Sequence, residues 1–128
     1  MILADTHAWV WGVAEPKRLS KDARAAMANA DRIAVSAISC WEVATLVLKG
    51  RLTLDRPTRD WLLQALAQPR IELIPLSPEI AARSADLGED VHGDPADHIL
   101  IATALELRLP LVTRDRQLRS CNLIRCIW

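Results

Sequence analysis

Residues 32–50 read RIAVSAISCWEVATLVLKG, and this stretch decides the fold class of the chain. Residues 32–37 have the short apolar, β-branched character of a buried strand. Residues 38–50 are dense enough in apolar side chains for a mostly buried helix, which Gly50 would end. A strand that passes directly into a buried helix is typical of proteins built around a parallel sheet.

The same alternation of strand and helix extends to both sides of this stretch. Further strands are predicted at residues 2–4, 71–76, 110–113 and 122–127. Further helices are predicted to begin near Ser20 and to cover residues 57–68, 78–88 and 96–108. Neither a repeat nor a linker divides the chain. We therefore expect one α/β domain over residues 1–128, with a central, mostly parallel sheet of about four to five strands and helices on both faces.

The composition limits the function classes. Sixteen basic and sixteen acidic residues give a net charge of zero, so whole-molecule electrostatics cannot hold nucleic acid and any such substrate needs local contacts. The three cysteines match neither a disulfide framework nor a zinc site, which favours a reducing, cytoplasmic setting. No apolar run reaches the roughly 18 residues of a membrane span, so no membrane association is expected.

Four carboxylates fall at predicted strand ends or helix starts. Asp5 ends the first strand, Glu42 lies in the first turn of the helix after the second strand, and Asp97 lies in the first turn of a later helix. Asp115 follows the strand at 110–113. In a parallel sheet these positions meet beyond the carboxyl ends of the strands, so we expect the four groups to share one pocket.

Each carboxylate also has a purely structural interpretation. Ser39 and Glu42 have the spacing of a capping box. Asp94 is a typical N-cap, because Pro95 after it suits the first helical position. Helix capping, a favourable first-turn charge or a solvated turn would explain the remaining three, Asp5, Asp97 and Asp115.

A cluster of such carboxylates predicts a particular chemistry. Like charges held within a few ångströms raise at least one pKa unless a cation lies between them. Hard oxygen ligands without a cysteine or histidine pair favour Mg²⁺ or Mn²⁺ over zinc. These ions assist phosphodiester hydrolysis, in which Thr6 or Thr113 could orient a water or a phosphate.

At this point the motifs can be compared with a known family. The segments LADTHAWVW (3–11), VSAISCWEVA (35–44), HGDPADHILIATALE (92–106) and LVTRD (111–115), with the closing strand to Trp128, resemble a PIN-domain ribonuclease of the VapC toxin type. The resemblance covers essentially the whole chain. It implies a PIN fold, a Mg²⁺- or Mn²⁺-dependent endoribonuclease, and the toxin of a toxin–antitoxin pair. It also implies a homodimer and an antitoxin segment that blocks the acidic groove.

The resemblance implies site residues as well. The catalytic and metal-binding residues would be Asp5, Glu42, Asp97 and Asp115, with Thr6, Thr113, Asp94 and His98 as possible accessory residues. Relatives usually have arginine where this chain has His98. Because histidine is only partly charged at neutral pH, activity would fall as the pH rises if His98 takes over that role. The alternative is a structural histidine with a satisfied ring nitrogen.

The other conspicuous side chains have less specific interpretations. His7 and His92 are interpreted as structural. The tryptophans are expected to be core or interface anchors, with the core as the default: Trp9, Trp11, Trp41 and Trp61. The arginines around Asp115 could contact RNA phosphates or acidic groups of an antitoxin, or form a solvated turn: Arg114, Arg116 and Arg119.

Three other functions compete with this interpretation. A phosphorelay receiver needs a phosphate-accepting aspartate after its middle strand, but the predicted strand at 71–76 is followed by Ser77-Pro78, and no lysine follows the later strand. A phosphatase with a DxD nucleophile pair is excluded because Thr6 and His7 follow Asp5. A PIN fold kept only as a non-catalytic binding partner of an antitoxin stays open. The expected activity is cleavage of single-stranded or loop RNA.

Overall fold

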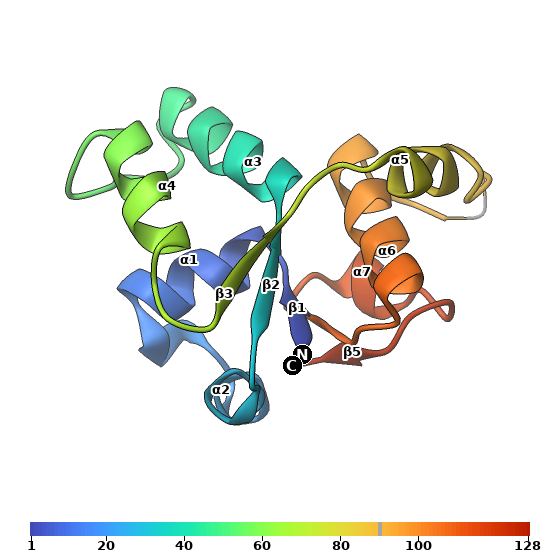
Figure 1. The fold of residues 1–128 in the computed structure, drawn as a ribbon, viewed down its shortest axis with the longest axis horizontal. Coiled ribbons are helices and arrows are strands. Elements are labelled where there is room, and N and C mark those ends of the chain that lie inside the picture. Colours follow the sequence, from blue (N-terminus) through green and yellow to red (C-terminus); the bar gives the residue numbers. More distant parts are fainter. Residues whose placement is uncertain (90) are drawn as a thin grey trace.

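The computed structural model describes residues 1–89 and 91–128 and is built around a five-stranded sheet (Figure 1). The strand order is β3-β2-β1-β4-β5, and every neighbouring pair is parallel. The expected parallel sheet is therefore confirmed. The strands are short: β1 Ile2–Ala4, β2 Ile33–Ser36, β3 Ile71–Ile74, β4 Leu111–Val112 and β5 Cys126–Ile127.

Strand β1 is the middle of the sheet. Ala4 lies opposite Val35 of β2 on one side and Val112 of β4 on the other, and all three residues of β1 are buried. The strand at 71–74 is third along the chain and lies at the edge of the sheet. It was treated as the middle strand when the sequence was compared with a receiver, and that assignment is wrong. Receivers have the order 2-1-3-4-5, which this sheet does not share.

Helices cover both faces of the sheet, as expected (Figure 1). Side chains of β1 alternate between the two layers, because Ile2 and Ala4 pack into one core and Leu3 into the other. The first layer holds α1 Thr6–Ala14, the 3₁₀ turn η1 Pro16–Arg18, α2 Lys21–Asn29, α3 Ala37–Leu48 and α4 Thr58–Leu66. The second layer holds α5 Pro78–Ala85, α6 Pro95–Leu107 and α7 Arg116–Arg119.

Helix α3 begins earlier than the sequence predicts. Its N-cap is Ser36, the last residue of β2, whose hydroxyl accepts a hydrogen bond from the amide of Ile38 at 3.2 Å. The predicted capping box of Ser39 and Glu42 is therefore wrong, and Glu42 lies in the second turn of the helix. This shift frees the Glu42 side chain from the backbone and lets it face a neighbouring helix.

The tryptophans divide between core and surface. Trp9, Trp11 and Trp61 are buried, and Trp9 packs edge-on against Trp61 with ring centroids 5.3 Å apart. Trp41 is 61% exposed on α3, so its expected place in the core is wrong. Among the helices of residues 1–89 and 91–128, none is long and apolar enough to cross a membrane.

Candidate functional site

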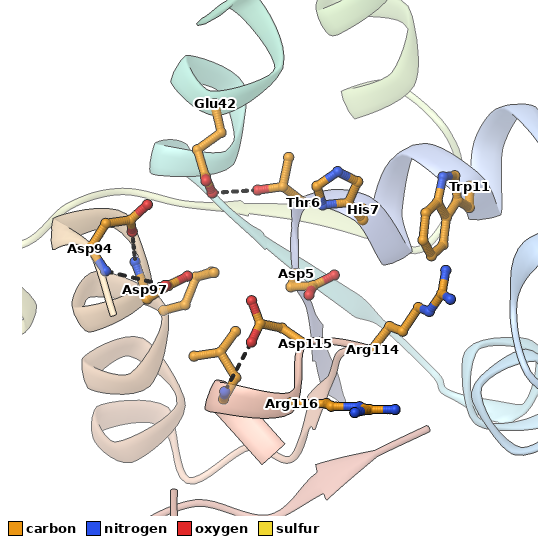
Figure 2. Close-up of a pocket in the computed structure, with 12 residues that line it drawn as sticks. Asp5, Thr6, His7, Trp11, Glu42, Asp94, Asp97, Arg114, Asp115 and Arg116 are labelled. Carbon is orange, nitrogen blue, oxygen red and sulfur yellow. Dashed lines mark hydrogen bonds between the residues drawn. The ribbon is translucent and has the colours of Figure 1, made fainter. Parts of the chain in front are cut away.

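A cavity of about 580 Å³ opens at the carboxyl ends of the central strands (Figure 2). Five carboxylates from four separate segments line it: Asp5, Glu42, Asp94, Asp97 and Asp115. The structure thus brings together the four predicted acidic residues and the predicted accessory Asp94. Its remaining wall consists of Thr6, His7, Trp11, Leu100, Arg114, Arg116 and Leu118.

Asp5 is the most firmly held of these acids. It is the N-cap of α1, and its Oδ1 accepts a hydrogen bond from the amide of Ala8 at 2.8 Å. Its Oδ2 accepts from the hydroxyl of Thr113 at 2.5 Å. Burial raises the pKa of Asp5, and these hydrogen bonds lower it in part. The capping role predicted for Asp5 therefore coexists with a place at the cavity.

Thr113 connects two of the acids from within the fold. While its hydroxyl donates to Asp5, it accepts from the amide of Asp115 at 3.0 Å. Asp115 in turn caps α7, because its Oδ1 accepts from the amides of Gln117 and Leu118. Thr113 is fully buried and does not line the cavity, so the expectation that it orients water or phosphate is not supported; it positions Asp5 and Asp115.

Glu42 is held by a hydroxyl of the neighbouring helix. Thr6 Oγ1 donates to Glu42 Oε1 at 2.6 Å and lies 2.9 Å from the hydroxyl of Ser39. Burial raises the pKa of Glu42, the Thr6 hydrogen bond lowers it, and the charges of Asp94 and Asp5 raise it further. Thr6 and the buried Ser39 therefore aim this carboxylate at the cavity.

Asp97 and Asp94 form a capping box at the start of α6. Asp94 Oδ1 accepts from the amide of Asp97 at 2.9 Å, and Asp97 Oδ2 accepts from the amide of Asp94 at 3.3 Å. Burial, followed by the charge of Asp94, raises the pKa of Asp97 to about 6, and the charges of Asp115 and Glu42 add to this. A structural first-turn role and a functional role are therefore both compatible with Asp97.

Gly93 controls the place of Asp97 and was not singled out from the sequence. Its φ of +126° lies in a region that L side chains rarely adopt. A Cβ atom at this position would lie 2.8 Å from both the Cβ and the Oδ2 of Asp97. Only glycine lets the loop pass this close to the carboxylate. The glycine immediately before the DPAD segment, at residues 94–97, was the available sequence signal.

The donor set fits a hydrated divalent cation. Burial raises the pKa of Asp5, Glu42 and Asp97, and the charges of neighbouring carboxylates raise it further, as expected for acids gathered in one place. Within the described ranges 1–89 and 91–128, however, no three His, Cys, Asp or Glu side chains are close enough to hold a metal ion directly. Mg²⁺ commonly keeps several waters and binds through one or two carboxylates, which suits a roomy acidic cavity.

The opposite wall of the cavity is basic and aromatic. His7 and Trp11 of α1 face Arg114 and Arg116, which flank Asp115 (Figure 2). The structural interpretation of His7 missed this position at the cavity. Arg119, which was grouped with the other two arginines, does not line the cavity. The direction of these side chains depends on how α1 and α7 meet, which local sequence does not specify.

His98 lies outside the cavity. Its Nε2 is 2.9 Å from the carbonyl oxygen of Val91, which ties α6 to the preceding loop. The half-buried ring has a satisfied nitrogen, as the structural alternative proposed. His98 therefore does not provide the charge beside the acids that arginine would provide in relatives, and the pH dependence expected from such a role loses its basis.

Comparison with known proteins gives one consistent family. The model of the PIN domain matches residues 2–122. Ribonuclease VapC22 of Mycobacterium tuberculosis is 43% identical over 119 residues, which cover 93% of this chain and 90% of that protein. Two solved structures share the fold at lower identity. VapBC2 from Rickettsia felis bound to a promoter DNA fragment has a TM-score of 0.72 at 18% identity, covering 98% of this chain and 97% of that one. A toxin–antitoxin complex from Klebsiella pneumoniae has a TM-score of 0.68 at 21% identity, covering 97% and 95%.

Proposed function

Because this chain belongs to the PIN-domain family, we propose that it is an RNA-hydrolysing toxin of the VapC type, a Mg²⁺- or Mn²⁺-dependent endoribonuclease. The observation that carries the proposal is the group of five carboxylates around one cavity; burial, and then the charges of neighbouring carboxylates, raise the pKa of Glu42 and Asp97 there. A carboxylate that only caps a helix does not need other carboxylates nearby. A site that binds a cation and then a phosphodiester needs several carboxylates close together.

The residues around the cavity have different proposed roles, which follow from their hydrogen bonds. Asp5, Glu42, Asp97 and Asp115 would hold a hydrated cation, one or two of them directly and the others through its waters. When bound, the cation would offset their repulsion and draw charge from the scissile phosphate. Thr113 keeps the Asp5 carboxylate turned toward the cavity, and Thr6 does the same for Glu42. Asp97, with a pKa of about 6, is the acid whose charge responds most readily to a cation near neutral pH.

The proposed partners are RNA, a cognate antitoxin and a second copy of the chain, in the cytoplasm. Two exposed apolar side chains support a protein partner. Trp41 and Leu48 are seven residues apart on one face of α3 and are 61% and 87% exposed. Large apolar groups left open in this way are typical of protein interfaces.

The test compares two first-turn aspartates. Purified chain free of antitoxin should cleave single-stranded RNA with Mn²⁺ and stop with chelator. Asp97→Asn should abolish cleavage and remove the thermal stabilisation by Mn²⁺, while the metal-free variant is at least as stable as the parent. Asp22→Asn, in the first turn of α2, is the matched control and should cleave normally.

The opposite results would contradict the proposal. If Asp97 serves only the helix, Asp97→Asn should cleave RNA and lose about 0.3–1 kcal/mol of stability. A parent chain that binds an antitoxin but never cleaves RNA with either metal would favour the non-catalytic PIN-fold binding partner.

A further inference from the structure

The cavity separates its charges into two halves. Its carboxylates come from the end of β1, α3, the start of α6 and the start of α7, whereas Arg114 and Arg116 lie on the other side (Figure 2). An acidic half alone repels an RNA strand, and the chain has no net positive charge to offset this. The basic half therefore provides local attraction beside the acids.

The two arginines at this wall are not engaged by the acids next to them. Among the described residues, neither Arg114 nor Arg116 forms an ion pair with a carboxylate or a side-chain hydrogen bond. The reason is visible at Asp115, whose carboxylate is turned to the amides of Gln117 and Leu118 at the start of α7. Both guanidinium groups therefore keep their donors available to a ligand.

Trp11 gives this wall a rigid base. The indole is only 7% exposed and its ring centroid lies 5.4 Å from that of His7 and 6.1 Å from that of Trp128. The Arg18 guanidinium carbon lies 4.5 Å from the Trp11 ring centroid, and that of Arg114 lies 6.0 Å from it. Cation–π contacts of this kind hold an arginine side chain without consuming its hydrogen-bond donors.

We propose that Arg114 and Arg116 form a binding subsite for a backbone phosphate of the RNA strand next to the phosphodiester that is cleaved, with Trp11 fixing Arg114. This inference rests on the proposed function, because it takes RNA as the substrate. Guanidinium groups bind phosphate oxygens through paired hydrogen bonds, which suits a subsite that positions the strand without reading its bases. The acidic half then receives the adjoining phosphate only when a cation is present.

The experiment measures RNA binding without cleavage. A fluorescein-labelled, mixed-sequence single-stranded RNA of twelve nucleotides is titrated in EDTA at several salt concentrations, and fluorescence anisotropy gives the dissociation constant. Loss of each phosphate contact should reduce the slope of log affinity against log salt by roughly 0.7. The double variant Arg114→Gln/Arg116→Gln removes the one phosphate contact of the subsite, so it should bind more weakly, with a slope reduced by about 0.7.

Two further variants separate the subsite from general charge. Arg119→Gln/Arg125→Gln removes the same charge from exposed positions outside the cavity and should keep the parent's slope. Arg114→Lys retains a cation and should also keep most of the slope. Equal slopes for the parent and Arg114→Gln/Arg116→Gln would overturn the subsite, and so would an equal loss in the control or no salt-dependent binding by the parent.

The assay also separates this inference from the proposed function. A reduced slope together with a parent that cannot cleave RNA would leave the subsite standing and reject the nuclease. If the parent cleaves RNA but the double variant has an unchanged slope, the nuclease function would be supported and the phosphate subsite rejected. An unchanged RNA slope combined with loss of binding to an oligoglutamate peptide would assign the wall to an acidic protein segment and overturn the phosphate subsite.

Discussion

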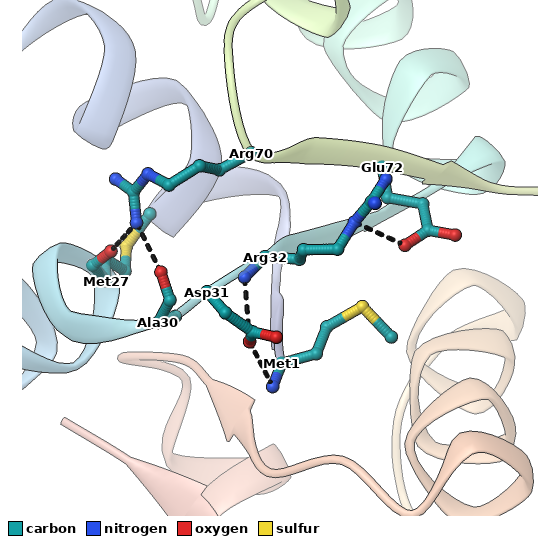
Figure 3. A network of polar contacts seen from close by, with 7 residues as sticks. All are labelled: Met1, Met27, Ala30, Asp31, Arg32, Arg70 and Glu72. Carbon is teal, nitrogen blue, oxygen red and sulfur yellow. Dashed lines mark hydrogen bonds and ion pairs between the residues drawn. The ribbon is translucent and has the colours of Figure 1, made fainter.

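Opposite charges are paired at the amino-terminal ends of the strands, whereas like charges are gathered at the carboxyl ends. Before β2, Asp31 lies 2.9 Å from the terminal amino group of Met1, and Arg32 lies 3.1 Å from Glu72 of β3 (Figure 3). The hydrogen bond with the amino terminus lowers the pKa of Asp31. At the other end, the same residue type at position 97 has its pKa raised to about 6.

The difference separates structural charges from functional ones. The Arg70 guanidinium also belongs to the amino end, where Nη1 donates to the carbonyls of Met27 and Ala30 at 3.1 and 2.6 Å. Each labelled charged group in that network forms an ion pair or a hydrogen bond with another group of the protein. The carboxyl end instead holds Glu42 and Asp97, whose pKa is raised by burial and then by the charges of neighbouring carboxylates, which a bound cation would offset. Changes at the carboxyl end should therefore affect activity, and changes at the amino end only stability.

Gly93→Ala should produce the largest effect. The new Cβ would lie 2.8 Å from Asp97 Oδ2, so the carboxylate must move, and RNA cleavage and Mn²⁺ binding should be lost. Gly50→Ala is the matched control, because its φ is also positive, at +71°, and no atom lies within 4 Å of the added Cβ. Gly50→Ala should cost about 1–2 kcal/mol in urea unfolding from backbone strain, and Gly93→Ala should cost more because of the added contact with Asp97. Full cleavage by Gly93→Ala would show that the loop does not fix Asp97.

The pH dependence of stability should differ between the parent and Asp97→Asn in chelator. The folded-state pKa of Asp97, about 6, exceeds its ordinary value of 3.8, so folding takes up a proton. The parent should therefore gain stability relative to the variant as the pH falls from 7 toward 4, and lose it again as the pH rises through 6. Mn²⁺ should reverse this trend, because a cation requires the ionised carboxylate.

Urea unfolding of both proteins at pH 7 and pH 5 measures this difference. Asp97→Asn is expected to be the more stable protein at pH 7 without metal. A constant difference between the two proteins across this range would mean that Asp97 is not crowded by the other acids, and would weaken the comparison between the two ends of the sheet.

Glu72→Gln should produce the smallest effect. This change breaks the ion pair with Arg32, in which the side chains are 39% and 55% exposed, so it should cost at most about 1 kcal/mol. RNA cleavage and Mn²⁺ binding should equal those of the parent, because the pair lies at the amino end of the sheet. A large loss of cleavage in a folded Glu72→Gln protein would break the division between structural and functional ends.

The sequence predicted the features that follow from strand and helix periodicity. The parallel sheet and the gathering of Asp5, Glu42, Asp97 and Asp115 follow from their positions at strand ends and helix starts. Features that depend on side-chain direction could not be predicted. Apolar density at 38–50 indicated a buried helix, but not that α3 turns Trp41 outward.

Local details of the site were also beyond prediction. The start of α3 at Ala37 changed the partner of Glu42 from a backbone amide to the hydroxyl of Thr6, 36 residues away. Helix α7 is only four residues long and leaves no periodic signal. The sequence shows three arginines near Asp115, but it does not show which of them line the cavity. Arg114 and Arg116 do, and Arg119 does not.

The hydrogen bond between Thr113 and Asp5 spans 108 residues and has a consequence for synthesis of the protein. Strand β1 is made long before β4, yet it is only three residues long and pairs with that strand. A polypeptide that ends before Thr113 cannot form this hydrogen bond to Asp5. The carboxylate of Asp5 is therefore held in place only after β4 and Thr113 have been made.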